Sequence, residues 1–399
     1  KYDYRSLIKV ASKENALVLN TPKRNELLKD GLSESKSNKC QILGRGAYGT
    51  VFKGIYHEHA VAVKIIRRCA VSTMHNEAHI LNWKHKNIVR LIKLESTLEC
   101  GLLIMERPNG LCLQRIVDTI ALPLLHRTLI TLDILAALRY CHSQRILHLD
   151  IKPPNILVAL GISSIDKHCR FERQYICKLC DFGSSIKLDE PTINKCSARG
   201  TLRYMSPEAL RAAPLSSAAD IYSLGITMWQ LQARRLPYQT LNCNESIAYQ
   251  VVKHELRPDN YALLEALKLS CEPAFNLPLS NCYCAGTKEQ TVDVVLSYLK
   301  KFKSPLDVVL STDLCKKANS LARRNLNFES AHGRVHKRSK QRKQARLAQY
   351  FVNPSVTTTT FGLEYAYSEL YKDCWLSQPE LRLSASQLKK RLELILSKC

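Results

Sequence analysis

His148-Leu149-Asp150-Ile151-Lys152-Pro153-Pro154-Asn155 is the most informative stretch of the chain, and Asp181-Phe182-Gly183 follows it. Asp150, Lys152 and Asn155 can form one loop that holds a general base, a cation that neutralises phosphate charge and an oxygen ligand for a metal. Transfer of a phosphoryl group requires these groups close together. The two stretches therefore predict such a site, with Asp150 as the base and with Mg²⁺ held by oxygens of Asn155 and Asp181.

The composition sets wide limits on the fold and the location. With 399 residues and 45% hydrophobic content, the chain can bury a large core, either as one large domain with an insertion or as two domains. No apolar run approaches the roughly 18 residues that cross a bilayer, so we expect no membrane contact. The 16 cysteines stand in apolar stretches, and no secretory leader precedes them, which favours a reduced, cytoplasmic protein.

The net charge of +24 favours contacts with phosphates, nucleic acid or acidic surfaces without identifying a partner. The run from Arg334 to Arg346 has seven basic residues and no acid. It can be a solvated loop, a nuclear-import patch, or a contact for nucleic acid or an acidic partner. We favour the solvated loop, because such runs are common in disordered insertions and no aromatic residue interleaves here for base stacking.

The pattern along the chain predicts an α+β fold of two lobes. Residues 1–38 read as a polar N-terminal extension, and 39–399 as one domain, with a small antiparallel sheet and one helix in 39–106 and a mainly helical part in 107–399. A basic, irregular stretch at about 260–361 reads as an insertion. The predicted strands are 41–43, 50–54, 60–66 and 102–105, and the predicted helices are 74–84, 128–141, 220–231 and 365–396.

A glycine-rich loop lies between the first two predicted strands. Without side chains at Gly44, Gly46 and Gly49, backbone N–H groups can approach nucleotide phosphates. A strand on both sides argues against a dinucleotide-binding turn, which would open a helix. Alone, the loop could equally be a tight hairpin, since glycine is the default turn residue.

Lys64 on the third predicted strand and Glu77 on the next predicted helix form a second candidate pair. A lysine that reaches the α- and β-phosphates needs an acidic partner to hold its flexible stem, and Glu77 can supply it. Taken singly, each is more often a solvated surface residue. The order of glycine loop, Lys64, Glu77, catalytic loop and Asp181 favours the functional interpretation.

In these motifs, the chain resembles the eukaryotic protein kinases over about residues 41–260 and 364–397. The resemblance implies a bilobal fold with ATP in the cleft between the lobes. It also implies roles for further residues: Leu43, Val51, Ala62 and Leu157 around the adenine, Met105 as the gatekeeper, Glu106 at the start of the hinge, Thr201 bonded to the catalytic base and lysine, Asp220 anchoring the catalytic loop, and Glu208 paired with Arg382.

A narrower likeness is to the Mos kinases, which share Leu149 inside the catalytic motif. It also rests on the stretches 177–185, 219–224, 226–230 and 256–258. This resemblance implies a serine/threonine kinase that acts on a MAP kinase kinase in the MAP kinase cascade, during oocyte meiotic maturation and arrest. We expect a monomer. The insertion departs from the compact family pattern. Alternatives are a catalytically dead kinase-fold scaffold, or a serine/threonine kinase with other substrates.

Leu149 also suggests a hypothesis about control. Most protein kinases have arginine at this position, where it pairs with a phosphate on the activation segment and orders that segment. Leucine cannot make that bond, so we expect no dependence on this switch and control mainly through the amount of protein. The alternative is that Leu149 is neutral packing and another basic residue holds the phosphate.

Overall fold

The computed structural model describes residues 42–46, 49–67, 70, 73–96, 100–165, 172–189, 199–239, 241, 243–259, 347, 349, 351 and 360–399. The chain divides into two compact units, Lys1–Arg234 with Lys343–Cys399, and Arg235–Arg342. The second unit contributes helix α7 (Asn244–Lys253) to the described residues. The predicted N-terminal extension and nearly all of the predicted insertion lie outside the described residues.

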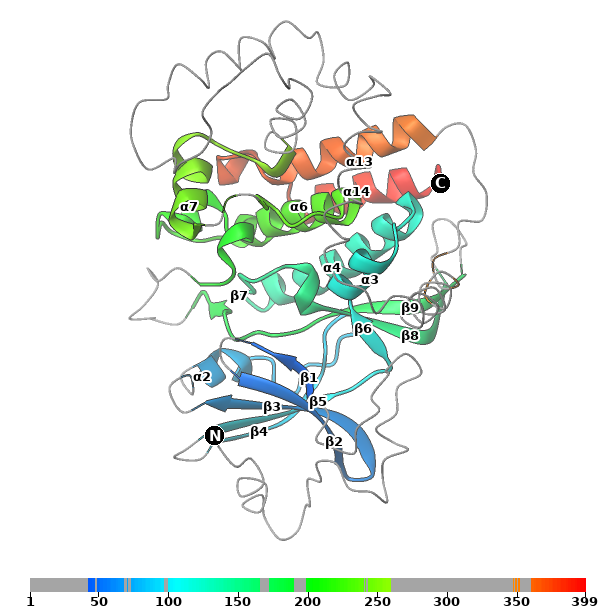
Figure 1. Ribbon diagram of the computed structural model, residues 1–399, viewed down its shortest axis with the longest axis vertical. Coiled ribbons are helices and arrows are strands. Elements are labelled where there is room, and N and C mark those ends of the chain that lie inside the picture. The colour runs from blue at the N-terminus through cyan, green and yellow to red at the C-terminus, as the bar shows by residue number, and fades with distance from the viewer. Residues whose placement is uncertain are drawn as a thin grey trace, which may run out of the picture. The chain divides into compact units, whose positions relative to one another are not determined.

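An antiparallel sheet of five strands forms the N-terminal part of the first unit (Figure 1). Alternating apolar residues put Val61, Val63 and Ile65 on one face, where they pack with Phe52 and other core residues. Lys64 therefore lies on the other face of its strand. In sheet order the strands are β1 (Ile42–Arg45), β2 (Gly49–Tyr56), β3 (His59–Arg67), β5 (Cys100–Glu106) and β4 (Leu91–Ser96).

The helix predicted over 74–84 is shorter than expected, because α2 spans Thr73–Ala78. Asn82 has φ 70°, a left-handed conformation that no helix continues. Leu81 bridges Leu91, and the ring of Trp83 meets Tyr140 and Phe182 edge to face. The apolar residues after Ala78 thus pack inward from a loop, so this part of the prediction is wrong.

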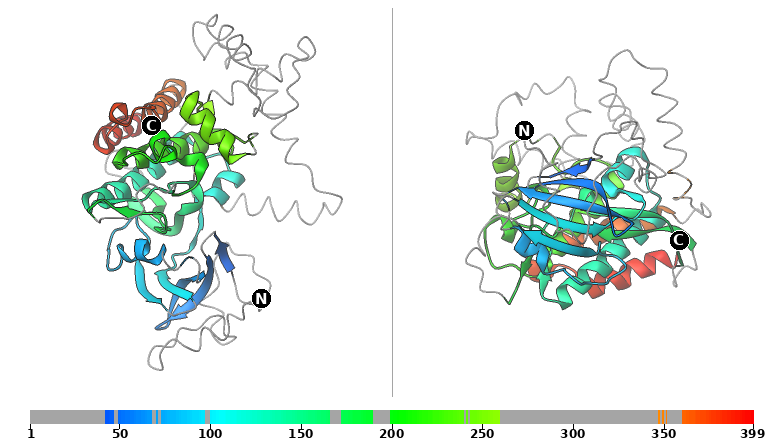
Figure 2. Two further views of the ribbon diagram at one scale, coloured as in Figure 1. Left: turned by 90° about the vertical axis from the view of Figure 1, so that its left-hand side faces the viewer. Right: turned by 90° about the horizontal axis from the view of Figure 1, so that it is seen from below.

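The C-terminal part of the first unit is helical. Helix α6 is buried nearly all round, as its apolar sequence predicts, and it packs against α4 and α13, while α14 packs against α4 (Figures 1 and 2). A Cβ on Gly225 of α6 would lie 2.8 Å from the Cβ of Cys374, so this close approach to α13 requires glycine. The helices are α3 (Leu113–Thr119), α4 (Leu124–Ser143), α5 (Pro207–Leu210), α6 (Ser217–Ala233), α13 (Thr360–Cys374) and α14 (Ala385–Leu396).

The helix predicted over 365–396 is therefore two helices. The 3-10 turn η6 (Pro379–Leu381) separates them, and Pro379 explains the break because proline cannot donate the backbone bond that a helix interior requires. The α+β prediction of a sheet-rich first part and a helical second part is confirmed. Within the described residues, no helix combines the length and apolarity needed to span a membrane.

Two pairs of strands carry the two loops singled out in the sequence. The loop of residues 148–155 joins β7 (Ile146–Leu147) to β8 (Ile156–Ile165) and ends in the 3-10 turn η4 (Pro153–Asn155). Asp181-Phe182-Gly183 joins β9 (Glu172–Leu179) to β10 (Ile186–Lys187). Since β8 pairs with β9 and β7 with β10, these pairings bring both loops together. β6 (Gly110–Cys112) completes the sheet of β8 and β9.

Candidate active site

Lys64 connects the sheet, α2 and the 181–183 loop. Its Nζ lies 2.5 Å from Oε1 of Glu77 and 2.7 Å from Oδ1 of Asp181. The Lys64 and Glu77 side chains are buried, whereas that of Asp181 stays 38% exposed. Burial lowers the pKa of Lys64, but the carboxylates of Asp181 and Glu77 outweigh it and raise that pKa above its ordinary value. Lys64 is therefore a fixed cation.

Asp150 is the centre of a second bonded group. Its Oδ1 accepts a hydrogen bond from the backbone N of Thr201 (2.8 Å), and its Oδ2 accepts from Lys152 Nζ (2.7 Å) and from Asn155 Nδ2 (2.8 Å). Lys152 Nζ also donates to Oγ1 of Thr201. The structure thus brings Asp150, Lys152, Asn155 and Thr201 together, with the carboxylate held on both oxygens.

A residue of α6 holds the backbone just before Asp150 through hydrogen bonds. Asp220 accepts backbone hydrogen bonds from Leu149 N (2.8 Å, Oδ1) and His148 N (3.0 Å, Oδ2). Burial opposes ionisation of Asp220, but the hydrogen bond and charge of His142 outweigh it and hold the pKa below its ordinary value. A carboxylate in this position holds the strained residue Leu149, which has φ 62°.

Asn155 and Asp181 have suitable chemistry for a divalent cation. Both amide hydrogens of Asn155 have acceptors, because Nδ2 donates to the backbone O (2.9 Å) and to Oδ2 of Asp150. Oδ1 is therefore the atom of this side chain that could bind a cation. Burial raises the pKa of Asp181, but the charge and hydrogen bond of Lys64 outweigh this and hold it below its ordinary value, so the carboxylate is ionised. Hard oxygens of this kind fit a divalent cation.

The glycine-rich loop begins and ends on paired strands. The N of Gly46 donates to the O of Gly49 (2.9 Å), which closes the turn between β1 and β2. A Cβ on Gly49 would lie 2.2 Å from the backbone O of Ile65, so the close pairing of β2 with β3 excludes a side chain there. Gly44 pairs with Val51 across the same turn.

The residues predicted around the adenine lie on separate strands. Leu43, Val51 and Ala62 stand on β1, β2 and β3, and Ala62 pairs with Met105 of β5. Leu157 lies on β8, outside that sheet. Leu43 is 44% exposed, and Val51, Met105 and Leu157 are half-buried, which leaves apolar surface for a ligand.

Glu106 differs from the other residues predicted to bind the nucleotide, because its side chain forms hydrogen bonds within the protein. Its Oε1 accepts hydrogen bonds from Lys178 Nζ (2.8 Å) and from the backbone N of Arg90 (3.0 Å). The carboxylate thus ties β5 to β9 and to the residue before β4. The backbone N of Glu106 also has a partner, because it donates to the O of Arg90 (3.0 Å).

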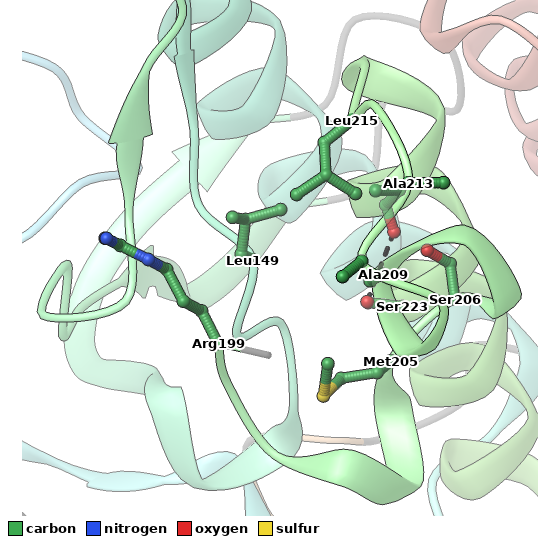
Figure 3. A pocket seen from close by; sticks show the side chains of 10 residues that line it. Leu149, Arg199, Met205, Ser206, Ala209, Ala213, Leu215 and Ser223 are labelled. Atoms are coloured by element: carbon green, nitrogen blue, oxygen red, sulfur yellow. Dashed lines mark hydrogen bonds between the residues drawn. The ribbon is translucent and has the colours of Figure 1, made fainter. Parts of the chain in front are cut away.

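Leu149 lies in an apolar cluster with Leu147, Ile186 and Ala219, next to a cavity of about 10 Å³. Leu149 and Leu215 point toward each other across it, whereas the guanidinium of Arg199 points away (Figure 3). A Cβ on Gly200 would lie 2.2 Å from the backbone O of Leu149 and clash with it. The backbone at Gly200 therefore passes very close to the loop of residues 148–155. Apolar side chains therefore surround Leu149.

Glu208 and Arg382 form a buried ion pair, as the resemblance implied. Arg382 donates to both carboxylate oxygens of Glu208, at 2.7 Å each. It also donates to the backbone O of Leu376 and of Ala218. This one guanidinium therefore joins α5 to the start of α6 and to the turn after α13.

Three residues that contact the site were not predicted from the sequence. His142 Nε2 lies 2.8 Å from Oδ2 of Asp220. Asn76 Nδ2 donates to the O of Gly183 (2.7 Å), and Trp83 packs against Phe182. The position of His142 in the last turn of an apolar helix was a weak signal for its role. The position of Asn76 beside Glu77 gave no such signal.

Comparison with known proteins identifies the family. The protein kinase domain model matches residues 37–392. The chain is 34% identical over 250 residues to the serine/threonine-protein kinase mos of Patiria pectinifera, covering 58% of this chain and 68% of the relative. It is 30% identical over 290 residues to the proto-oncogene serine/threonine-protein kinase mos of Mus musculus, covering 66% and 80%. The chain belongs to the protein kinase family and is a Mos-like serine/threonine protein kinase.

Proposed function

We propose that this kinase acts as a MAP kinase kinase kinase, with a role in oocyte meiotic maturation and arrest. Its substrate is then a Ser or Thr hydroxyl on a MAP kinase kinase. The likeness to the Mos kinases supports the choice of substrate and role. One observation carries the chemistry: Asp150 is bonded to Lys152, Asn155 and Thr201, while Lys64 is bonded to both Glu77 and Asp181.

The protein kinase family uses ATP with a divalent cation, and we propose Mg²⁺ with Asn155 and Asp181 as its protein ligands. Bound there, the cation neutralises phosphate charge. Lys64, fixed by Glu77, holds the nucleotide phosphates, and Gly44, Gly46 and Gly49 let the backbone approach them.

Asp150 orients the substrate hydroxyl and takes its proton. Because Thr201 N and Asn155 Nδ2 fix the two carboxylate oxygens separately, the base is positioned before substrate binds, which reduces reorganisation during the reaction. Lys152 shares Oδ2 with Asn155 and neutralises charge on the transferred group. Thr201 ties Asp150 and Lys152 to the end of the activation segment.

The test is a radiolabelled ATP assay with a recombinant MAP kinase kinase. Lys64→Met and Asp150→Asn should each lower turnover by about 10²-fold or more, because each removes a positioned charge from the reaction. Lys93→Met is the matched control, since Lys93 lies on β4 and pairs with Glu95 instead. Equal incorporation in all four proteins contradicts the site assignment. Equal labelling of an unrelated Ser/Thr-containing protein contradicts only the choice of substrate.

A further inference from the structure

The loop of residues 79–90, between α2 and β4, has a strongly basic outer face. Lys84, Lys86 and Arg90 are all exposed, and the twelve residues of this loop include no Asp or Glu. The loop follows directly on the helix that carries Glu77. A charge excess this local attracts anions more strongly than the average surface of the molecule does.

This face is hollowed. An open hollow of about 370 Å³ is lined by Asn82, Lys84, Arg90, Leu91 and Ile92. Leu91 is buried and Ile92 half-buried, whereas the three polar residues are exposed. The hollow therefore combines an apolar base with two cations and one amide at its edge, a combination that suits a peptide with an acidic and an aliphatic side chain.

The nearby acids do not neutralise these cations. Glu95 pairs with Lys93, and Glu106 accepts from Lys178 and from the backbone N of Arg90. Among the described residues, no ion pair joins a carboxylate to the side chain of Lys84 or Arg90. Both charges are therefore available to a ligand, with the guanidinium suited to a two-point contact with carboxylate or phosphate.

The backbone beneath the hollow is already fixed. Val89 N donates to the O of Leu179 (2.9 Å), and Leu179 N donates to the O of Asn87 (2.8 Å). Asn87 Nδ2 donates to the O of Cys177 (2.9 Å), and Trp83 packs against Phe182. Because the inner face of the loop is anchored in this way, a ligand on the outer face would bind without first ordering the backbone.

We propose that this hollow is a docking site for an anionic peptide segment of a protein partner. Lys84 and Arg90 bind its carboxylate or phosphate, and the half-buried Ile92 contacts a neighbouring aliphatic side chain. Charge complementarity selects this occupant, because an apolar base is flanked by two cations that pair with no carboxylate in the described part of the chain. The site is separate from the catalytic groups, so the proposal does not depend on the identity of the kinase substrate.

Fluorescence anisotropy with the full chain, without ATP, tests the proposal. Three labelled peptides share one leucine-containing sequence and differ only in carrying Glu, phosphoserine or Gln at two positions. The Glu or phosphoserine peptide, or both, should bind saturably and more tightly than the Gln peptide. Tighter binding of phosphoserine assigns the anion as phosphate; otherwise it is carboxylate. Changing Lys84→Glu and Arg90→Glu together should weaken binding by about tenfold or more.

The matched control changes two exposed lysines elsewhere, Lys253→Glu with Lys390→Glu, which alters the net charge equally. This control should bind as the unchanged chain does. Equal weakening in both double variants would reduce the effect to general attraction by a basic protein and overturn the proposal. The proposal would also be overturned if no peptide bound saturably to the unchanged chain, or if the Gln peptide bound as tightly as the others. If the Glu variant does not fold, Lys84→Gln with Arg90→Gln answers the same question.

Discussion

Leu149, inside the catalytic loop, is surrounded by apolar side chains. It is 6% exposed, and its apolar neighbours include Ile186 of β10 and Ala219 of α6. An unpaired charge in such surroundings costs several kcal/mol, so this cluster is a poor site for a phosphate. The backbone N of Leu149 is instead held by Asp220, which positions the catalytic loop without any modification.

We therefore expect the chain to be active without phosphate on its activation segment. Thr192 and Ser197 belong to that segment and lie outside the described residues. Thr192→Ala and Ser197→Ala, made together in bacterially produced protein, should leave turnover within about threefold, because no Arg at position 149 awaits a phosphate. Steady-state phosphorylation of a MAP kinase kinase measures this. A collapse in turnover would mean that another cation, such as Arg199, holds an essential phosphate.

Short motifs allowed the sequence to predict which side chains would lie close together in the candidate site. Asp150, Lys152 and Asn155 lie within one loop, so their spacing alone predicted that they would meet. Glu208 and Arg382 are far apart in the chain, and only the family resemblance suggested their pairing. Asn76 and His142 could not be found from sequence, because their contacts with Gly183 and Asp220 depend on how separate elements pack.

At the scale of elements, the sequence predicted four of the five strands of the first sheet, β1, β2, β3 and β5, but not β4 (Leu91–Ser96). The apolar run in β3 matches its burial, which is continuous from Val61 to Ile66. The prediction of one helix over 74–84 was wrong for a physical reason. Ile80, Leu81 and Trp83 have helical spacing, but the left-handed Asn82 ends any helix and their burial comes from a loop. Apolar spacing cannot distinguish a short helix and a packed loop from one longer helix.

The pair of Glu208 and Arg382 joins α5, α6 and the turn after α13, so it should matter for stability in a pH-dependent way. Burial opposes ionisation, but Arg382 outweighs it and holds the pKa of Glu208 below its ordinary value of 4.5. Its contribution is complete above that value and is lost as the pH falls through the lower pKa of the folded state. Glu208→Gln should lower the free energy of unfolding by about 3–5 kcal/mol at neutral pH.

Urea unfolding of the unchanged chain and of Glu208→Gln, between neutral pH and about pH 3, measures this difference in the free energy of unfolding. The difference should become smaller as the pH falls below 4.5. The control is Asp373→Asn, because Asp373 forms an exposed pair with Arg391. That change should cost less than about 1 kcal/mol. Equal effects of the two substitutions, or a difference that does not change with pH, would show that Glu208 does not act through this ion pair.

For the whole molecule, the dominant electrostatic term is the excess of 59 Lys and Arg over 35 Asp and Glu. Like charges repel over distances that salt shortens, from about 30 Å at 0.01 M to about 10 Å at 0.1 M ionic strength. Exposed pairs such as Arg391 with Asp373 lose little when screened. Raising NaCl from about 0.01 to 0.3 M should therefore raise the melting temperature by a few degrees, as followed by circular dichroism. A fall in the melting temperature would mean that attractive pairs, despite the net charge of +24, outweigh the repulsion.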